Sequence, residues 1–223
     1  MPIANQEMIR DNNRRLVLEY IVNNPPVSRA DLSKQLKLTK ATISAIVQDL
    51  IQQNLILEIG SAKTSLGRKP ILLDFNQQFG GSLAIDVRHR QILALISDLK
   101  GENCRVKEYP FHPEDRLFPL LTAIIEEHLK EQEESKRKIL GISVGIYGVV
   151  QNNRIIFTPY YPLPDPELGS LLEERFRIPV IVENEANLSV LGESAFHYGC
   201  RNMIHINVHD GIGMGILIDG HLY

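Results

Sequence analysis

Several polar residues at the start of one predicted helix have the chemistry needed to contact a nucleic acid. They are Thr39, Lys40, Thr42 and Ser44, and the small residues Ala41 and Ala45 stand among them. A helix that enters the major groove needs a slim polar face, and its amino-terminal end favours phosphate through free amides and the macrodipole. Hydroxyls can hydrogen-bond to phosphates and to base edges, and alanine permits close approach. We therefore predict that Thr39, Lys40, Ala41, Thr42 and Ser44 bind DNA.

Two neighbouring segments carry further groups suited to DNA. Ser28 and Arg29 open the preceding predicted helix and could hold the phosphate backbone. The loop Lys63-Thr-Ser-Leu-Gly-Arg-Lys-Pro70 adds Lys63, Arg68 and Lys69, and its extended Gly-Arg-Lys-Pro part suits a minor groove, where arginine meets deep negative potential. The alternative interpretation is a protein–protein module with a basic hairpin, and any single hydroxyl could instead be a helix cap or a surface group.

Three helices and two strands are predicted in the N-terminal part of the chain, and they must position these residues. The sequence predicts a helix over 5–23, a helix from the cap Ser28 to Leu36, and a helix opened by Thr39. The third helix has a buried stripe, which consists of Ile43, Ile46, Val47, Leu50 and Ile51. Strands over 55–59 and 70–75 flank a polar loop. Three helices followed by a two-stranded ribbon predict a winged helix-turn-helix domain over residues 1–76.

The rest of the chain alternates strands with helices. Strands are predicted at 82–87, 91–98, 105–111, 139–146, 179–182, 203–208 and 213–218, and helices at 114–134, 168–176 and 184–197. The charge run from Glu131 to Lys138 is interpreted as a solvated helix end and loop. This alternation predicts a mixed α/β domain over residues 77–223.

Composition and charge narrow the class of protein. Residues 1–75 carry 10 Lys and Arg against 7 Asp and Glu, a net charge of +3, and the remainder carries 14 against 20, a net charge of −6. A basic end beside an acidic body is a weak indication of a nucleic-acid-binding arm. Cys104 and Cys200 are the two cysteines, and they lie far apart in the sequence and outside any Cys-x-x-Cys spacing. We therefore predict that both are reduced thiols. No apolar run approaches the about 20 residues that a membrane span needs, and no leader begins the chain, so we expect a cytoplasmic protein without a membrane partner.

Five stretches together resemble the ROK family (repressors, open reading frames, kinases), and specifically its sugar-responsive repressors. They are Pro26 to Leu32, Gly67-Arg-Lys-Pro70, Gly141-Ile-Ser-Val-Gly-Ile-Tyr-Gly148, Val182-Glu-Asn-Glu-Ala-Asn187 and Gly211 to Tyr223. The resemblance implies a winged helix-turn-helix followed by an actin-like, ribonuclease-H-like domain of the sugar-kinase type. The chain stops at Tyr223, before the Glu-x-Gly-His motif and the cysteine-rich zinc cluster of the family. We therefore expect an incomplete domain, no metal, no cofactor, weakened sugar binding and apolar surface that a partner chain covers.

The same resemblance implies a sugar-effector site and argues against catalysis. Asn184 and Glu185 fall in the sugar-contacting motif, and Gly148 falls in the floor of the cleft; the alternative for Asn184 is a helix cap. Glu185 replaces the aspartate that acts as the base in kinases of the family. Asp86 is followed by Val87-Arg88-His89-Arg90 in place of the glycine turn that cradles phosphates. The turn Asp210-Gly-Ile-Gly-Met-Gly215 keeps the glycines of the family. They could bind a phosphate, or they could be required by the backbone geometry of a plain hairpin. We expect no catalytic residue.

The preferred hypothesis is a sequence-specific transcriptional repressor of a sugar-utilisation operon. It would bind operator DNA as a homodimer and respond to a small sugar. Two alternatives stay open: an ATP-dependent sugar kinase with a DNA-binding arm, and a constitutive DNA-binding regulator whose sensor domain is incomplete.

Overall fold

The chain folds into two compact units, seen in a computed structural model that describes residues 3–61, 70–134, 137–208 and 211–223. The units are Met1–Phe79 and Gly80–Tyr223, whereas the sequence pattern places the boundary between residues 76 and 77. The difference is the 3-10 turn η1 (Gln77–Phe79). The Phe79 amide donates to the Asn76 carbonyl at 2.9 Å, and the Asn76 amide donates to the Leu55 carbonyl at 2.9 Å. These bonds hold the turn to the first unit.

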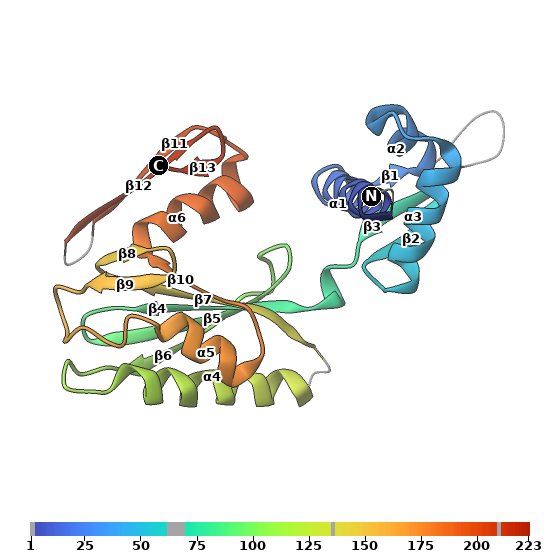
Figure 1. The fold of residues 1–223 in the computed structure, drawn as a ribbon. Coiled ribbons are helices and arrows are strands. Elements are labelled where there is room, and N and C mark those ends of the chain that lie inside the picture. Colours follow the sequence, from blue (N-terminus) through green and yellow to red (C-terminus); the bar gives the residue numbers. More distant parts are fainter. Residues whose placement is uncertain (1–2, 62–69, 135–136, 209–210) are drawn as a thin grey trace. The chain divides into compact units, whose positions relative to one another are not determined.

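The first unit has the predicted winged helix-turn-helix arrangement (Figure 1). Its elements are α1 (Ile3–Asn23), β1 (Val27–Ser28), α2 (Arg29–Leu36), α3 (Lys40–Gln52), β2 (Ile56–Ser61) and β3 (Ile71–Phe75). The strands form one antiparallel sheet in the order β1-β3-β2. The sequence pattern missed β1, because a two-residue strand is defined by its partner and not by its own periodicity.

The core of the first unit is built by the predicted stripe of α3. Ile43, Ile46, Val47 and Leu50 are buried. They share one hydrophobic cluster with residues of the other elements: Val17 and Ile21 of α1, Val27 of β1, Leu32 of α2, Ile56 of β2 and Leu73 of β3. Ile51, the last residue of the stripe, is partly buried against this cluster. Because the whole stripe packs inward, the remaining side of α3 faces outward.

The second unit is centred on a five-stranded mixed sheet. Its strands are β4 (Gly81–Val87), β5 (Gln91–Asp98), β6 (Arg105–Pro110), β7 (Ile139–Ile146) and β10 (Val180–Asn184), in the order β10-β7-β4-β5-β6. The pairs β10–β7 and β4–β7 are parallel, and the pairs β4–β5 and β5–β6 are antiparallel. The mixed α/β prediction is confirmed.

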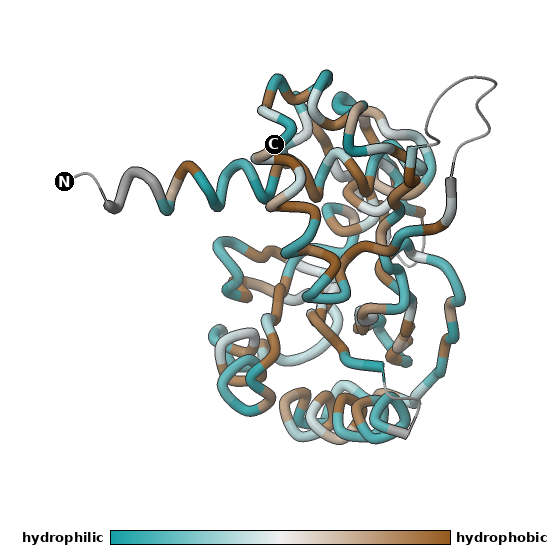
Figure 2. Tube along the Cα trace, turned by 90° about the vertical axis from the view of Figure 1, so that its right-hand side faces the viewer, coloured by the Kyte–Doolittle hydropathy of each residue, from teal (hydrophilic) through white to brown (hydrophobic). Residues whose placement is uncertain are grey.

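Helices cover both faces of this sheet. Figure 1 shows α4 (Leu117–Glu134) and α5 (Leu168–Phe176) beneath it and α6 (Glu185–Glu193) above it. Apolar and polar residues alternate around the turns of α4 (Figure 2), so one side of the helix can pack on the sheet. Leu83, Ile85 and Val87 of β4 point into that core and are buried.

Two predictions about helix ends need correction. The charge run is not a wholly solvated end: Gln132 is 1 % exposed, and Glu131 forms an ion pair with Lys107 of β6. Residues 135–136 of that run lie outside the described residues. The helix predicted from Asn184 to His197 ends at Glu193 and continues as a π-helical turn, η2 (Ser194–Tyr198).

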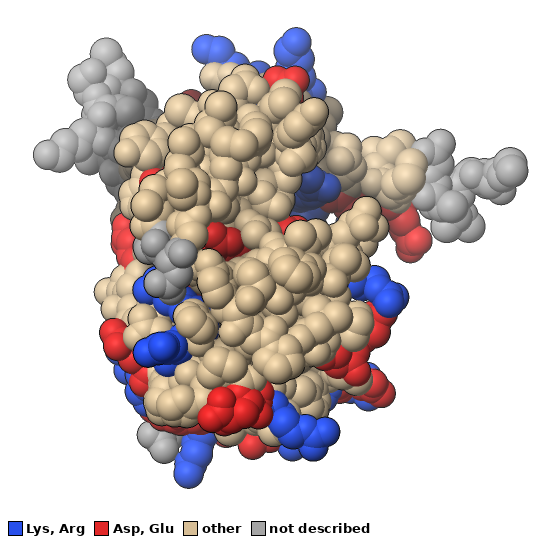
Figure 3. Space-filling view, turned by 90° about the vertical axis from the view of Figure 1, so that its left-hand side faces the viewer, with Lys and Arg blue, Asp and Glu red and all other residues tan. Residues whose placement is uncertain are grey.

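Two small sheets complete the second unit. The hairpin β8 (Val149–Gln151) and β9 (Arg154–Phe157) was not predicted, whereas β11 (Met203–Val208) and β12 (Ile212–Ile218) were; β13 (His221–Leu222) extends the β11–β12 sheet. One face of that sheet is aliphatic and exposed, and its side chains include Ile204, Ile206, Val208, Ile212, Met214 and Ile218. Figure 3 views the molecule from the side on which this sheet lies, and it shows a broad area without Lys, Arg, Asp or Glu, with charged side chains mostly at its margins. Each described helix is too short or too polar to span a bilayer.

Candidate functional site

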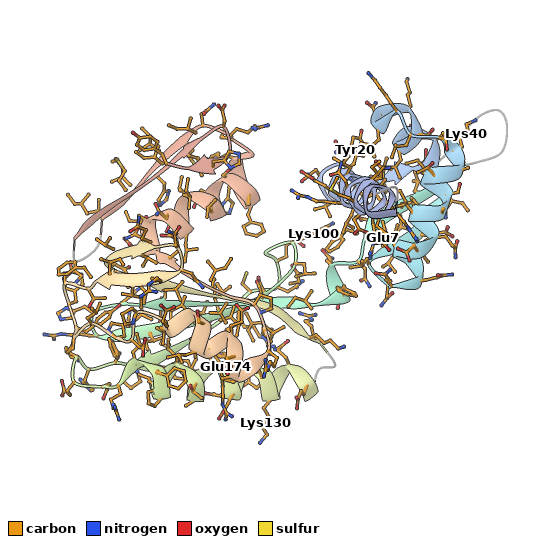
Figure 4. The ribbon with its side chains drawn as sticks, viewed as in Figure 1. Glu7, Tyr20, Lys40, Lys100, Lys130 and Glu174 are labelled. Carbon is orange, nitrogen blue, oxygen red and sulfur yellow. The ribbon has the colours of Figure 1, made fainter. Side chains whose placement is uncertain are left out.

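The start of α3 presents a polar, small-residue surface to solvent. Thr39 caps the helix, since its hydroxyl accepts from the Thr42 amide at 3.1 Å and lies 2.9 Å from the Thr42 hydroxyl. Lys40, at the amino-terminal end of the helix (Figure 4), is exposed, as are Ala41 and Ser44. Thr39 is thus both a cap and an exposed group, while Thr42 is half-buried beside it. The predicted contact residues therefore share one outward-facing end of the helix.

Ser28 caps α2, and a phosphate contact through this residue stays a prediction. Its hydroxyl accepts from the Asp31 amide at 3.2 Å, and the Asp31 carboxylate accepts from the Ser28 amide at 3.1 Å and from the Ser28 hydroxyl at 2.6 Å. Hydrogen bonds from the Ser28 side chain, and next from its backbone, lower the pKa of Asp31. Only 4 % of Ser28 is exposed, so in this structure its hydroxyl bonds within the start of α2.

The remaining predicted DNA contacts lie on the ribbon side of the unit. Arg29 is half-buried and pairs with Glu58 of β2 at 2.9 Å, which ties the start of α2 to the first strand of the wing. Lys63, Arg68 and Lys69 lie outside the described residues. The strands that flank them, β2 and β3, pair antiparallel, with a bulge between Glu58 and Gly60.

In the second unit, the predicted effector residues meet at the carboxyl ends of parallel strands. Gly145 of β7 is in register with Asp86 of β4 and with Glu183 of β10, so all three strands end at the same edge of the sheet. Ligands of open α/β sheets bind in the crevice at such an edge. Gly148 follows β7, and Asn184 and Glu185 stand at the junction of β10 and α6, so the structure brings these three residues together.

The Asn184 side chain connects the start of α6 to the backbone of Gly148. Its side-chain oxygen accepts from the Ala186 amide at 2.9 Å and from the Asn187 amide at 3.3 Å, which caps α6. Its side-chain nitrogen donates to the Gly148 carbonyl at 2.8 Å. The capping role is therefore present in the structure, and a sugar contact through this residue stays a prediction.

Close backbone packing explains the glycines around the edge. A Cβ on Gly148 would collide with the Phe157 carbonyl of β9. In β12, a Cβ on Gly213 would collide with the Glu185 carboxylate, and one on Gly215 with the Ala186 carbonyl. Gly213 and Gly215 thus let β12 pack closely on the start of α6, which explains these two glycines without a phosphate. Asp210 lies outside the described residues.

A small pocket of about 210 Å³ opens at this place. Its lining comprises Tyr147, Gly148, Pro159, Tyr160, Asn184, Glu185, Asn207, Gly211, Ile212 and Gly213. The sequence pattern did not single out Pro159, Tyr160, Asn207 or Ile212 as site residues. The polar groups of Asn184, Glu185 and Asn207 together with two tyrosine rings suit a small ligand that carries several hydroxyls.

The turn between β4 and β5 carries two side chains, Arg88 and His89, that pack against residues at this edge of the sheet. Arg88 pairs with Asp86 at 2.7 Å, and the His89 ring stacks on Tyr160 with centroids 5.2 Å apart. Behind them, burial raises the pKa of the Tyr161 hydroxyl, and the nearby Asp86, Tyr147 and Glu185 raise it further. Side chains therefore occupy the place where a phosphate would need bare backbone amides.

The second unit also has a larger hollow that none of the predicted effector residues lines. This hollow, of about 530 Å³, is lined by residues between Phe111 and Pro119, which include the start of α4, by residues between Tyr161 and Asp165, and by Leu171 of α5. Four prolines contribute to its walls, and Phe111, which directly follows β6, lies among the lining residues. Within the part of the chain that the structure describes, no group of three or more His, Cys, Asp or Glu residues could hold a metal ion.

Comparison with known proteins gives consistent relatives along the whole chain. The model of the ROK family matches residues 82–223, and the model of the MarR family matches residues 12–62. The xylose repressor of Bacillus spizizenii is 35 % identical over 230 residues, which cover 100 % of this chain and 59 % of that protein. The xylose repressor of Lactiplantibacillus pentosus is 34 % identical over 221 residues, which cover 96 % of this chain and 57 % of that protein.

Solved structures support the same fold. A ROK family transcriptional regulator, a homologue of the Escherichia coli MLC protein, aligns with a TM-score of 0.79 and 26 % identity over 96 % of this chain and 56 % of its own. A ROK family glucokinase from Streptomyces griseus aligns with a TM-score of 0.55 and 23 % identity over 65 % of this chain and 46 % of its own, which shows the fold alone. The chain thus spans little more than half the length of its relatives. Since the ROK family model matches more than half of its residues, this chain belongs to the ROK family.

Proposed function

We propose that this chain is a sequence-specific DNA-binding transcriptional repressor of a sugar-utilisation operon, with a sugar as its effector and no catalytic activity. The observation that carries the proposal is the exposed start of α3, where Lys40, Ala41 and Ser44 face outward on a winged helix-turn-helix. Relatives named xylose repressors support it and make xylose the first sugar to test.

In the proposed mechanism, α3 enters the major groove and its first turn contacts phosphates and base edges. Two copies would place two such helices about 34 Å apart on a near-palindromic operator, in the cytoplasm where the DNA lies. The sugar would bind among Gly148, Asn184 and Glu185. It regulates DNA binding only if it favours one arrangement of the second unit over another.

The kinase alternative is disfavoured by the turn after β4. Arg88 pairs with Asp86 at 2.7 Å where a nucleotide-binding turn needs glycine amides. An assay of ADP release with xylose or glucose tests this point directly. Turnover at about 1 s⁻¹ or faster, which is ordinary for an enzyme, would overturn the proposal.

The DNA-binding half is tested by gel shift on genomic fragments selected by repeated rounds of binding. Lys40→Ala should weaken binding and reduce the slope of log affinity against log salt by about one, because one phosphate contact is lost. The matched control is Lys130→Ala, which removes an exposed charge that points away from the sheet on α4 (Figure 4); its slope should equal that of the wild type. Absence of binding to any DNA at low salt would overturn the function.

The effector half uses the same assay with xylose added. Xylose should release the wild-type protein from DNA, whereas Glu185→Gln should keep DNA binding and lose the release. If the wild-type complex ignores xylose and other sugars while binding DNA, the constitutive regulator is the correct alternative.

A further inference from the structure

Tyr160 stands where three separate segments meet at the pocket. It lies in the loop between β9 and α5, and its ring stacks on His89 at 5.2 Å with an interplanar angle of 27°. The same ring meets Tyr147 edge-on, with centroids 6.4 Å apart and an angle of 61°. A methyl group added to Gly211 would lie 2.8 Å from the Tyr160 hydroxyl oxygen. The ring therefore packs against the β4–β5 turn and the β7–β8 turn, and its hydroxyl lies close to Gly211, directly before β12.

These contacts make the tyrosine a fixed wall of the pocket. Aromatic side chains have few torsions, and packed rings move only when their neighbours move. One neighbour, Tyr147, precedes Gly148, whose backbone lies directly against the Phe157 carbonyl. Gly211 offers no side chain that could rotate away from the hydroxyl. The pocket thus has little freedom to widen on this side.

The pocket that this wall limits is small and mixed in character. Its volume of about 210 Å³ lies below the usual range for drug-sized ligands, about 300–1,000 Å³. Asn184, Glu185 and Asn207 provide polar groups, and the rings of Tyr147 and Tyr160 provide apolar faces. A ring of carbon atoms with hydroxyls around its edge satisfies both kinds of lining.

We propose that Tyr160 determines which sugars the pocket accepts, by excluding the extra hydroxymethyl group that a hexose carries relative to a pentose. The inference rests on the proposed function, since it requires that this pocket binds the effector. D-Xylose and D-glucose are the sharpest pair of probes, because their pyranose rings carry the same hydroxyls in the same orientations. Glucose differs only by the hydroxymethyl group.

The first test is calorimetric titration of the full chain with each sugar. The wild type should prefer xylose by at least about tenfold, a difference in the range that one added group produces in a fitted pocket. Tyr160→Ala should bind the two sugars equally well, and Tyr160→Phe, which keeps the ring, should retain the preference. The control is Tyr198→Ala, because Tyr198 is 69 % exposed on η2 and does not line the pocket; its preference should equal that of the wild type.

A second test does not depend on removing the ring. Gly211→Ala should push the Tyr160 ring into the pocket and lower the affinity for xylose, because the new methyl meets the hydroxyl. The double variant Gly211→Ala with Tyr160→Phe should recover that affinity, since the clashing oxygen is gone. This non-additive result identifies a direct contact.

The outcomes separate the two proposals. Xylose binding without preference over glucose in the wild type overturns the role of Tyr160 alone, as does a preference that survives in a folded Tyr160→Ala. Additive effects of Gly211→Ala and Tyr160→Phe overturn the contact on which the role depends. Binding of no sugar by the wild type overturns the effector part of the proposed function and this inference with it.

Discussion

Asn184 serves the fold and the candidate pocket through the same amide group. Its oxygen caps α6, and its nitrogen holds the Gly148 carbonyl at 2.8 Å. The capping part could be predicted from the sequence, because an asparagine before a helix has a local signature. The bond to Gly148 could not, since the two residues stand 36 positions apart and meet only through the parallel pairing of β7 and β10.

Tyr160 and Asn207 show the same limit for the pocket. Neither residue belongs to a recognisable motif, and each reaches the site from a loop or an edge strand of a different sheet. Their shared place depends on how β9 packs beside β10 and how β11 packs on α6, and no local periodicity encodes that packing. Gly148, Asn184 and Glu185 were found because a family motif names them, although their role with sugar stays a prediction.

His128 makes the stability of the second unit depend on pH. It is 2 % exposed on α4, and its Nε2 atom lies 3.2 Å from the Tyr109 hydroxyl. Burial, and next the charge of Lys107, lower the pKa of His128. The folded protein therefore keeps it neutral, while the unfolded chain takes up a proton near pH 6.5. Its stabilising effect is complete above about pH 6.5 and is lost as the pH falls toward the lowered pKa.

The expected result is a steeper loss of stability in acid for the wild type than for His128→Phe. The slope of the free energy of unfolding between about pH 6.5 and 5 should differ by up to about 1.4 kcal/mol per pH unit, the value for one proton. Urea denaturation followed by tyrosine fluorescence measures it. The Tyr109 hydroxyl keeps Glu127 as a partner at 2.9 Å in the variant. Parallel pH profiles would show that this histidine is not the responsible group.

At the level of elements, local signals predicted the helices well and the short strands poorly. The capping box of Ser28 and Asp31 and the stripe of α3 depend on neighbours in sequence, so their pattern is complete before folding. The strands β1, β8, β9 and β13 are two to four residues long and exist through their partners. The π-helical turn after Glu193 likewise has no separate sequence signal.

The turn between α2 and α3 contains a residue whose replacement should stabilise the first unit. Lys37 ends α2 in the left-handed conformation, with φ 54° and ψ 31°. Glycine adopts this conformation without the cost of a Cβ, and part of the gain is offset by the greater freedom of glycine in the unfolded chain. Lys37→Gly should therefore raise the free energy of unfolding by about 0.5–1 kcal/mol.

Hydrogen exchange of the α2 and α3 amides measures that change in the first unit. The matched control is Lys34→Gly, which removes the same charge from an exposed position inside α2. It should lower stability by about 1 kcal/mol, because glycine is a poor helix former. Equal effects of the two variants would mean that charge, and not backbone conformation, controls stability here.

On the scale of the whole molecule, two compact units carry two different candidate sites. The chain has no tryptophan and seven tyrosines, of which Tyr20 alone belongs to Met1–Phe79. Tyrosine fluorescence therefore reports mainly on Gly80–Tyr223, and amide exchange in α3 reports on the other unit. A division into two parts could be predicted from the sequence, because the pattern of apolar residues changes along the chain from helical spacing to alternating strands and helices.

Ligand binding should stabilise the units separately. Xylose at one hundred times its dissociation constant should raise the unfolding free energy of the second unit by about 2.7 kcal/mol. Operator DNA should do the same for the first unit. Any effect of xylose on the first unit, measured with DNA bound, equals the coupling free energy between the sites. A sugar that stabilises neither unit would contradict the effector proposal.

The exposed aliphatic face of the β11–β12 sheet has a thermodynamic consequence. Side chains such as Ile212, 81 % exposed, and Val208, 70 % exposed, are already hydrated in the folded state. Unfolding therefore hydrates less new apolar area than it would in a fully covered sheet. The heat-capacity increment per residue of this unit should fall below the usual value of about 12–15 cal/mol/K, because apolar hydration dominates that increment. Its stability curve is correspondingly shallow, so the unit tolerates cooling and warming over a broader span for a given maximum stability.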